Sequence, residues 1–340
     1  MNAPGMDSTV AALLATGKGI LAADESLPTI AKRFAALQIP STEEERLAYR
    51  DLLFATPGLG EYISGVILFD ETIRERNLGG VPMPEALRQQ GIIPGIKVDH
   101  GTVALSNFPG EKFTQGLGNL RDRLAEYRAL GARFTKWRAV LAVGEKTPSV
   151  PCIRANATAL AQFAALSQEA GLVPVVEPEV LMDGAHTLAR SEAATRATLE
   201  GVFAALSEQR VVLEQLLLKT SMVVAGADCP EQPEPAEVAA ATLRCLRRAV
   251  PSAVPGIVFL SGGQGDETAT QRLAAICTER DPAWKLSFSF GRALQAPALK
   301  IWRGLAANIP AAQKALQHRA RCNSLALQGR YAATAEGTAT

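Results

Sequence analysis

The residue of this chain best suited to chemistry is a lysine in an apolar setting. Lys219 ends the run 213–218, which holds four leucines, one glutamate and one glutamine. A buried ammonium is costly because it loses its hydration. Burial and a neighbouring cation both favour the neutral amine, which is the nucleophilic form. Lys136, within Phe134-Thr135-Lys136-Trp137-Arg138, is a candidate for that neighbour. The alternative is a strand-end lysine whose ammonium reaches solvent.

Other charged and hydroxyl residues share this position at the end of an apolar run. A single charged strand end is usually the start of a solvated loop, but that explanation does not suit so many ends at once. In a barrel of parallel strands the carboxyl ends converge on one face, where active sites are built. We therefore predict one shared site from the residues at these ends: Asp24, Lys97, Asp99, Lys136, Arg138, Glu177, Glu179, Lys219, Ser261, Ser289 and Arg292.

Two glycine-containing segments predict a phosphate site. Ser261-Gly262-Gly263-Gln264-Gly265 follows the seventh apolar run, and Phe290-Gly291-Arg292 follows the eighth. Glycines let backbone N–H groups approach an anion closely, and a helix start adds its dipole. In barrels the loops after strands seven and eight are the usual place for a phosphate. A second basic group predicts another phosphate at the far end of the substrate; it consists of Lys32, Arg33, Lys97 and Arg138.

The elements that position these residues alternate between short apolar runs and amphipathic stretches. The strand candidates are 19–23, 63–69, 93–98, 133–137, 172–176, 213–218, 256–260 and 285–290. The helix candidates include 41–54, 120–130, 155–170, 188–206, 235–250 and 267–277. Such alternation means a parallel sheet, and eight units in one chain favour a closed α/β fold, the (β/α)8 TIM barrel.

Smaller signals refine these boundaries. Ser41 with Glu44 three residues later predicts a capping box, and Gly131 and Gly171 are placed to end two helices. We predict a single barrel domain over residues 1–340, with a last helix at about 311–327. The small, polar, alanine-rich residues 329–340 are predicted to form a flexible tail.

Composition excludes several classes of function. Acidic and basic residues nearly cancel, which gives a net charge of +1 and no general field for nucleic acid or a membrane surface. The start of the chain lacks the features of a signal peptide, and no run approaches the ~20 apolar residues of a membrane span. Five dispersed cysteines fit reduced thiols in the cytoplasm. The three histidines, His100, His186 and His318, are not paired at ligand spacing, so we expect no catalytic metal.

Motifs spread over nearly the whole chain resemble the class I, Schiff-base type of fructose-1,6-bisphosphate aldolase. They begin at Gly17-Lys18-Gly19-Ile20-Leu21-Ala22-Ala23-Asp24-Glu25-Ser26 and end at Asn323-Ser324-Leu325-Ala326. Between these come, in order, Gly65-Val66-Ile67-Leu68-Phe69, Gly95-Ile96-Lys97-Val98-Asp99, Lys136-Trp137-Arg138, Val176-Glu177-Pro178-Glu179, Leu217-Leu218-Lys219, Phe259-Leu260-Ser261-Gly262-Gly263-Gln264 and Gly291-Arg292-Ala293-Leu294-Gln295.

The resemblance implies a role for each matching residue. Lys219 matches the lysine that forms the imine with the substrate's C2 carbonyl, and Lys136 the lysine beside it. Glu177 matches the acid–base group that dehydrates the carbinolamine, Glu179 its companion, and Asp24 the carboxylate that handles the C4 hydroxyl proton. Two sets match the phosphate contacts: Ser261, Gly262, Gly263, Ser289, Gly291 and Arg292 for the 1-phosphate, and Lys32, Arg33, Lys97 and Arg138 for the other end.

The implied reaction is reversible cleavage of fructose 1,6-bisphosphate to dihydroxyacetone phosphate and glyceraldehyde 3-phosphate, as in glycolysis and gluconeogenesis. The chemistry is coherent, because a protonated imine is an electron sink for the carbanion that carbon–carbon cleavage leaves. The resemblance implies no metal and no cofactor, a phosphorylated sugar as substrate, and a homotetramer.

Two departures and two alternatives stay open. Leu27-Pro28-Thr29 stands where relatives often have Thr-Gly-Ser, and the chain ends in Thr340 where some relatives have a tyrosine implicated in proton transfer at C3. One alternative is a Schiff-base aldolase for another phosphorylated ketose or for deoxyribose phosphate. The other is a non-catalytic scaffold or anion-binding protein with the same fold, against which the intact set of ionisable residues argues.

Overall fold

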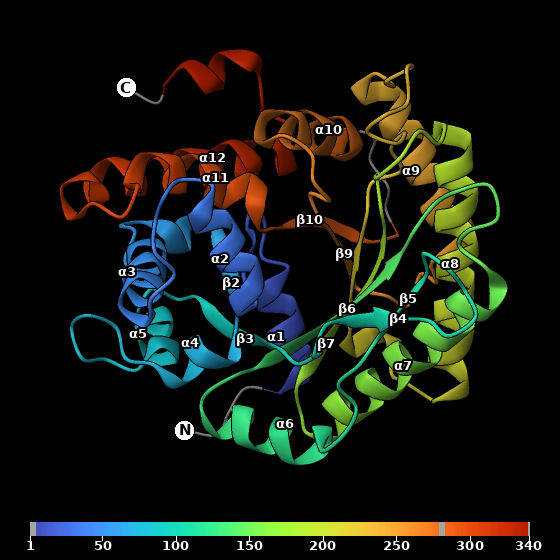
Figure 1. Ribbon diagram of the computed structural model, residues 1–340, viewed down its shortest axis with the longest axis horizontal. Helices are drawn as coiled ribbons and strands as arrows, with labels where there is room; N and C mark the ends of the chain where they lie inside the picture. The colour runs from blue at the N-terminus through green and yellow to red at the C-terminus, as the bar shows by residue number, and fades with distance from the viewer. Residues whose placement is uncertain (1–4, 279–282, 339–340) are drawn as a thin grey trace.

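Eight parallel strands close into a barrel surrounded by helices, which confirms the predicted (β/α)8 fold (Figure 1). The computed structural model describes residues 5–278 and 283–338, and the statements below concern these residues. Around the barrel the strand order is β1-β10-β9-β8-β7-β6-β3-β2. Their bounds are β1 Gly19–Ala23, β2 Ile63–Leu68, β3 Ile93–Lys97, β6 Phe134–Leu141, β7 Val173–Val180, β8 Leu217–Thr220, β9 Gly256–Phe259 and β10 Lys285–Phe290.

The remaining elements cover the barrel or extend from it. A short antiparallel hairpin follows β3 and was not predicted; it is formed by β4 Thr102–Ala104 and β5 Lys112–Thr114. The α-helices are α1 Met6–Leu13, α2 Leu27–Ala35, α3 Glu43–Phe54, α4 Asp70–Arg74, α5 Met83–Gln89, α6 Leu120–Ala129, α7 Val150–Glu169, α8 Leu188–Glu208, α9 Pro235–Ala249, α10 Asp266–Thr278, α11 Arg292–Trp302 and α12 Ile309–Leu327. Short 3-10 helices are η1 Leu59–Glu61, η2 Leu213–Gln215, η3 Ala306–Asn308 and η4 Ala333–Thr338.

Three predicted strands differ from the structure by more than one residue at an end, and the other differences are of one residue. The predicted strand 213–218 begins with the 3-10 turn η2, and the strand itself is Leu217–Thr220. The predicted strands 133–137 and 172–176 continue to Leu141 and Val180, respectively. Both predictions stopped where polar residues begin, but those residues remain paired in the ladder between β6 and β7. The polar side chains of Arg138 and Glu179 bond to each other there, and the apolar residues Ala139, Leu141 and Val180 of the same extensions are buried in the larger core cluster.

The predicted helix-ending glycines are confirmed, and the predicted N-cap of α3 lies one residue later in the structure. The N-cap of α3 is Thr42 rather than Ser41, and its hydroxyl accepts a hydrogen bond from the Glu45 backbone N–H at 3.3 Å. The Thr42–Glu45 pair has the same spacing as the predicted pair, which was therefore one residue early. Gly131 and Gly171 follow the ends of α6 and α7 with positive φ angles, as expected for C-terminal glycines.

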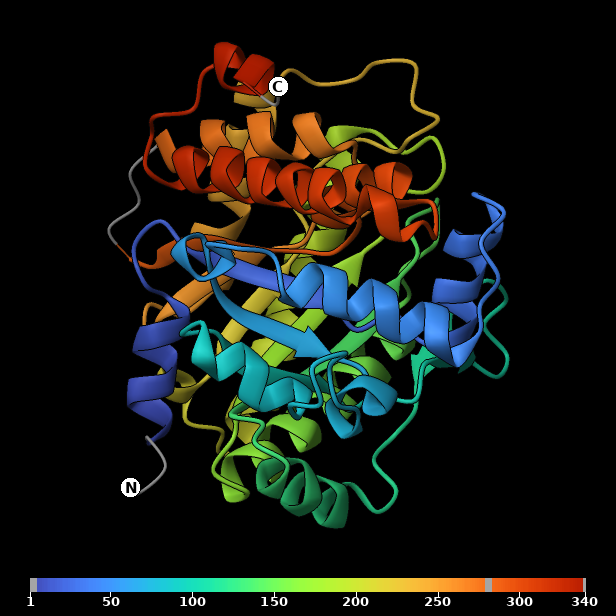
Figure 2. The ribbon, with the colours of Figure 1, turned by 90° about the vertical axis from the view of Figure 1, so that its left-hand side faces the viewer.

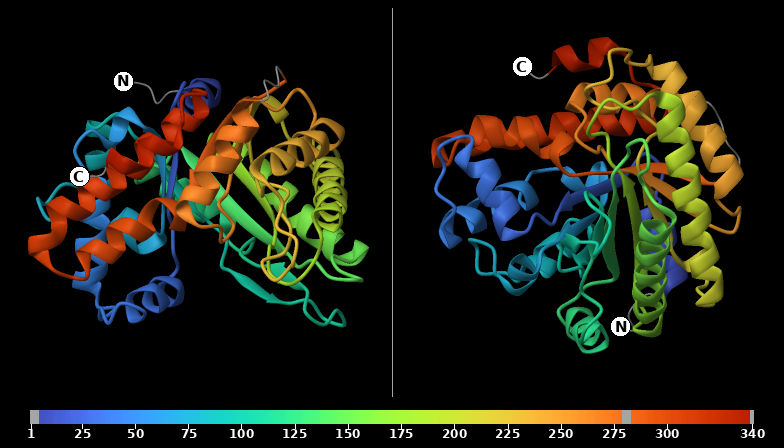
Figure 3. Two further views of the ribbon diagram at one scale, coloured as in Figure 1. Left: turned by 90° about the horizontal axis from the view of Figure 1, so that it is seen from above. Right: turned by 45° about the vertical axis from the view of Figure 1, so that its right-hand side comes forward.

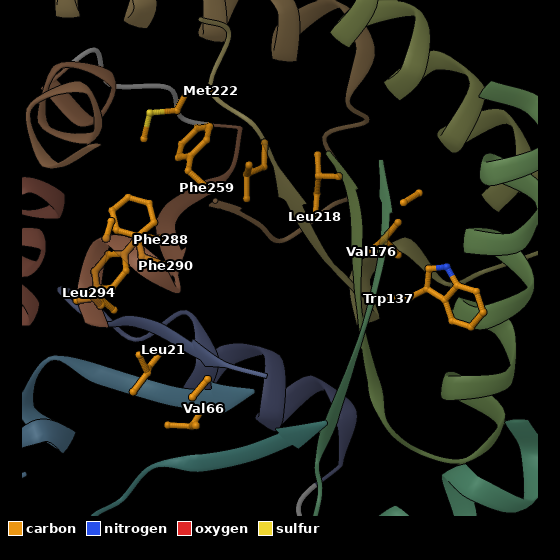
Figure 4. Packing of buried hydrophobic residues seen from close by; sticks show 14 of the residues in the cluster. Leu21, Val66, Trp137, Val176, Leu218, Met222, Phe259, Phe288, Phe290 and Leu294 are labelled. Atoms are coloured by element: carbon orange, nitrogen blue, oxygen red, sulfur yellow. The ribbon is translucent and has the colours of Figure 1, made fainter. Parts of the chain in front are cut away.

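Two apolar clusters form the core on the two faces of the sheet. The larger lies between the strands and the surrounding helices and includes Leu21, Val66, Trp137, Val176 and Leu218 (Figure 4). The smaller joins the other face of the strands to α1; its strand members are Ile20, Ala22, Ile67, Phe134, Val173, Val175, Leu217 and Val258. Because side chains alternate along a strand, this second set faces the barrel interior and closes it near α1.

The helices form a nearly continuous outer layer. Helices α7, α8, α9 and α10 pack each against the next along one flank of the barrel (green to orange in Figure 3). On another side α12 packs against both α10 and α11, and crosses the molecule as the long red helix of Figure 2. The 3-10 helix η4 contacts α12 near the C-terminus. The single-domain organisation and the flexible tail stay predictions, and residues 339–340 of that tail lie outside the described residues.

Candidate active site

Four buried ionisable side chains contact one another in the barrel. The Glu177 carboxylate lies between two lysines, with Oε1 3.1 Å from Lys219 Nζ and Oε2 2.9 Å from Lys136 Nζ. Lys136 Nζ also donates to Asp24 Oδ2 at 2.8 Å. None of the four residues is more than 9% exposed, so their charges interact with little screening by water.

Strand geometry explains why these residues meet. Glu177, Lys136 and Lys219 each follow, by two positions, an apolar residue of the interior cluster, and Asp24 does so just past the end of β1. Side chains two apart in a strand point to the same face, so all four project into the barrel. The contact between Lys136 of β6 and Asp24 must cross the interior, because β6 and β1 are not neighbours in the sheet.

The two lysines have pKa values perturbed in opposite directions. Burial lowers the pKa of Lys219, and the Lys136 ammonium adds to this effect, so the pKa stays below its ordinary value although Glu177 opposes the shift. Burial would also lower the pKa of Lys136, but Asp24 and Glu177 together raise it above the ordinary value. Lys219 is therefore the lysine more easily deprotonated, and Lys136 is the permanent cation.

Asp24 is held in its ionised form by the same contacts. Burial alone would raise its pKa, but the ammonium groups of Lys136 and Lys219 bring the pKa of Asp24 well below its usual range. Asp24 is therefore a carboxylate in the resting site, where it accepts a hydrogen bond from Lys136. The cluster thus combines a potential nucleophile, a fixed cation and two carboxylates.

The predicted second basic group is present as a set of ion pairs. Lys97 pairs with Asp99, Arg138 with Glu179, and Arg33 with Glu25. Arg33 and Arg138 keep 25% and 40% of their side chains exposed, so their remaining N–H groups are open to a ligand. Lys32 is exposed on α2 and, among the described residues, takes no part in this network.

The two glycine-containing segments lie together. A Cβ on Gly263 would be 3.3 Å from Arg292 Nη2. The loop after β9 therefore lies against Arg292, the first residue of α11. Gly262 and Gly263 have positive φ angles, which an L-residue adopts only with strain. Gly291 directly precedes α11, and a Cβ there would lie 3.2 Å from the Ala22 carbonyl oxygen.

Two serines complete this region. Ser261 is buried directly after Leu260 at the end of β9. Ser289 is a buried residue of β10, paired in register with Ile20, and its hydroxyl has no hydrogen-bond partner within the described part of the chain. Buried hydroxyls without a partner are uncommon, so this hydroxyl is free to bond a ligand.

Sequence reasoning missed the group that anchors Arg33. The buried Glu25 also pairs with Arg50 of α3 at 2.8 Å and accepts a hydrogen bond from Gln295 of α11 at 2.8 Å. Arg50 is only 3% exposed and looks like an ordinary residue of an amphipathic helix in the sequence. The one available signal was the second carboxylate directly after Asp24.

Pro28, the predicted departure near this site, is accommodated by the fold. It lies in the first turn of α2, which Ser26 precedes as N-cap. Proline fits this turn because its missing N–H would have no helical partner there.

Known proteins resemble this chain over nearly its whole length. Residues 6–340 match the family model described as "Fructose-bisphosphate aldolase class-I". The chain belongs to this family. It is therefore an enzyme of the lyase class and of the metal-independent type that the sequence resemblance implied.

Relatives of this family match over nearly their full length. A probable class 1 fructose-bisphosphate aldolase from Xanthomonas axonopodis pv. citri is 53% identical, over 97% of this chain and 99% of that protein. Fructose-bisphosphate aldolase 2 of Plasmodium berghei is 48% identical, over 97% and 90%. A Plasmodium falciparum aldolase, crystallised with TRAP and a small-molecule inhibitor, superimposes with a TM-score of 0.95 at 47% identity, covering 96% and 95% of the two chains.

Other family members differ in cellular compartment. Relatives at 48% identity include a chloroplastic form from Chlamydomonas reinhardtii and a cytosolic form from Arabidopsis thaliana. In the part of this chain that is described, no helix is both long and apolar enough to cross a membrane.

Proposed function

We propose that this aldolase cleaves fructose 1,6-bisphosphate reversibly to dihydroxyacetone phosphate and glyceraldehyde 3-phosphate through an imine on Lys219. The observation that supports this proposal is the Glu177 carboxylate shared by two lysines whose pKa values are shifted in opposite directions. The lowered pKa makes Lys219 the nucleophile, and the raised pKa keeps Lys136 as a fixed cation beside it.

We assign one residue to each step of this reaction. The Lys219 amine attacks the C2 carbonyl, and the carbinolamine loses water as Glu177, 3.1 Å away, transfers the protons. Asp24 accepts the C4 hydroxyl proton while the C3–C4 bond breaks. The electron pair of that bond moves into the protonated imine and leaves an enamine, and the aldehyde departs.

The basic groups hold the two phosphates of the substrate. The 1-phosphate would bind at Ser261, Gly262, Gly263, Ser289, Gly291 and Arg292, where glycine N–H groups, an unpartnered hydroxyl and a helix start come together. The other phosphate would contact Lys32, Arg33, Lys97 and Arg138. Glu179 holds Arg138 in place for that contact.

Trapping the imine tests this mechanism. Borohydride added with dihydroxyacetone phosphate should inactivate the enzyme, and peptide mapping should find the adduct on Lys219. An adduct on Lys136, or no adduct, would contradict the proposal. Chelators should leave turnover unchanged, and an activity that chelators abolish and zinc restores would place the enzyme in another class.

Substrate range and assembly extend the proposal. Two separate basic groups favour a bisphosphate over a one-phosphate ketose, which relative turnover rates on the two substrates would decide. We also propose a cytoplasmic location and, by resemblance to the family, a homotetramer. Light scattering of the purified protein would measure the latter.

A further inference from the structure

Three side chains with metal-binding atoms meet where the C-terminal segment contacts α12. His318 and Cys322 lie four residues apart on α12, and Glu336 comes from η4. His318 Nε2 is 3.6 Å from Cys322 Sγ and 3.5 Å from Glu336 Oε2, and Cys322 Sγ is 3.8 Å from the same Oε2. Cys322 is buried and His318 and Glu336 are partly buried between α12 and η4, and η4 lies on the outer side of α12 (Figures 1 and 2).

The three separations match the edges of a tetrahedral zinc site. With zinc–sulfur bonds of about 2.3 Å and zinc–nitrogen and zinc–oxygen bonds of about 2.1 Å, the S–N, N–O and S–O edges are about 3.6, 3.4 and 3.6 Å. The observed distances of 3.6, 3.5 and 3.8 Å differ little from these values. One point therefore lies at bonding distance from all three atoms without rearrangement of the backbone.

Surrounding groups orient the carboxylate as in known metal sites. Tyr331 donates its hydroxyl hydrogen to Glu336 Oε1 at 2.8 Å, and Arg319 pairs with Oε2. Ligating carboxylates are commonly held by such outer hydrogen bonds. Oε2 retains a lone pair for a cation beside the Arg319 contact. Arg319 is itself fixed by the Asp266 carbonyl oxygen and by Thr270 of α10.

We propose that His318, Cys322 and Glu336 bind one Zn²⁺ ion, which fastens the C-terminal segment to α12. A thiolate, an imidazole and one carboxylate form a ligand set that suits zinc, whereas Mg²⁺ and Ca²⁺ prefer oxygen ligands alone. Three protein ligands leave the fourth position to water. Binding displaces the thiol proton of Cys322, so the affinity should rise with pH.

The nearby Arg319 sets the expected strength of this site. Its positive charge opposes the metal, so we expect weaker binding than in a structural site with four protein ligands.

The zinc site uses none of the residues proposed for catalysis. Its test therefore does not depend on turnover, and a failure of the catalytic proposal would leave it unaffected.

Titration of the full-length protein with Co²⁺ alone tests the proposal. Tetrahedral cobalt bonded to a thiolate absorbs in the near ultraviolet and the visible, and added Zn²⁺ should bleach both bands at one equivalent. Cys322→Ser should abolish the near-ultraviolet band, and Glu336→Gln should weaken binding at least tenfold. Cys277→Ser, which changes a half-buried cysteine of α10 outside the cluster, should bind as the native protein does.

Proteolysis provides a second measurement that needs no spectroscopic metal. Trypsin should cleave after the exposed Arg330 at the start of the tail, and Zn²⁺ should slow this cleavage in the native protein but not in Glu336→Gln. This conservative change in η4 covers the case in which Cys322→Ser fails to fold. No saturable Co²⁺ binding, a near-ultraviolet band that survives Cys322→Ser, or equal zinc protection in Glu336→Gln would each overturn the proposal.

Discussion

Replacing Lys136 with methionine should raise the pKa of Lys219 and slow imine formation near neutral pH. Both ammonium groups contact the same carboxylate, at 2.9 and 3.1 Å, so their nitrogens are at most about 8 Å apart. At an effective dielectric constant of about 20, two unit charges at that distance repel by about 2 kcal/mol. Without this repulsion Lys219 holds its proton more tightly. At a pH below the Lys219 pKa of both the native protein and the variant, the neutral amine is therefore about thirtyfold rarer in the variant.

The pH profile of imine trapping measures this effect. The protein is saturated with dihydroxyacetone phosphate, reduced with cyanoborohydride between pH 6 and pH 10, and the adduct on Lys219 is quantified. The profile of Lys136→Met should move to higher pH. Lys136→Arg keeps the charge and should keep the native profile. Lys285→Met, at the exposed start of β10, serves as the control for the loss of a lysine elsewhere in the barrel.

Folding must be checked beside the kinetics. Lys136→Met leaves two buried carboxylates without their cation, and breaking a buried pair in this way costs about 3–5 kcal/mol of stability. Chemical denaturation therefore sets the conditions in which each variant is folded. A profile that stays in place, or moves to lower pH, in folded Lys136→Met would refute the argument that Lys136 lowers the pKa of Lys219.

Three further predictions follow from other contacts. Arg292→Ala should weaken ketose phosphate binding by about 1.5–3 kcal/mol, because a charged hydrogen bond is lost; an unchanged Michaelis constant for every phosphorylated substrate would move the phosphate site elsewhere. Removing residues 332–340 should change C3 proton exchange in dihydroxyacetone phosphate by less than about tenfold, because we assign this step to fixed groups of the barrel such as Glu177 or to the substrate's own phosphate. Tyr331→Phe should behave similarly, since the Tyr331 hydroxyl is bonded to Glu336 and burial raises its pKa; a hundredfold loss in either variant with imine formation intact would show that the tail delivers the proton. Burial, with Glu71 and Glu43 nearby, raises the pKa of Glu75 to about 6, so its ionisation destabilises the folded state as pH rises from about 4.5 through 6. Glu75→Gln should therefore add about 1 kcal/mol of stability at pH 7, allowing for partial exposure, and almost none at pH 4; an equal gain at both pH values in urea denaturation would exclude this cause.

The barrel was predictable because its signals are local and repeat. Most strands contain an apolar run, β10 alternates apolar and polar residues, and the glycines after α6 and α7 end those helices where the sequence placed them. One error arose because the run 213–218 begins with a 3-10 turn, and two arose where polar residues continue a strand. Arg138 and Glu179 interrupt the hydrophobic pattern, yet they bond to each other across neighbouring strands, so β6 and β7 extend past them.

The candidate site was predictable only as a list of residues. Lys219, Lys136 and Asp24 could be placed at converging strand ends, but which carboxylate touches which lysine depends on contacts across the barrel interior. Arg50 was not predicted at all, because it meets its partner Glu25 only through the tertiary packing that brings α3 beside the residues after β1. Contacts of this kind involve residues far apart in the chain and have no spacing that a sequence pattern can reveal.

The net charge of the buried cluster bears on how the site distinguishes a ketone from an alcohol. With Lys219 neutral, the negative charges of Asp24 and Glu177 outweigh the single positive charge of Lys136. A cation on the Lys219 nitrogen completes the balance, and a delocalised iminium is cheaper to bury there than a compact ammonium. An interior that holds the neutral amine is thus complementary in charge to the proposed intermediate. A ketone can generate that cation, whereas the corresponding alcohol, of nearly the same shape, cannot.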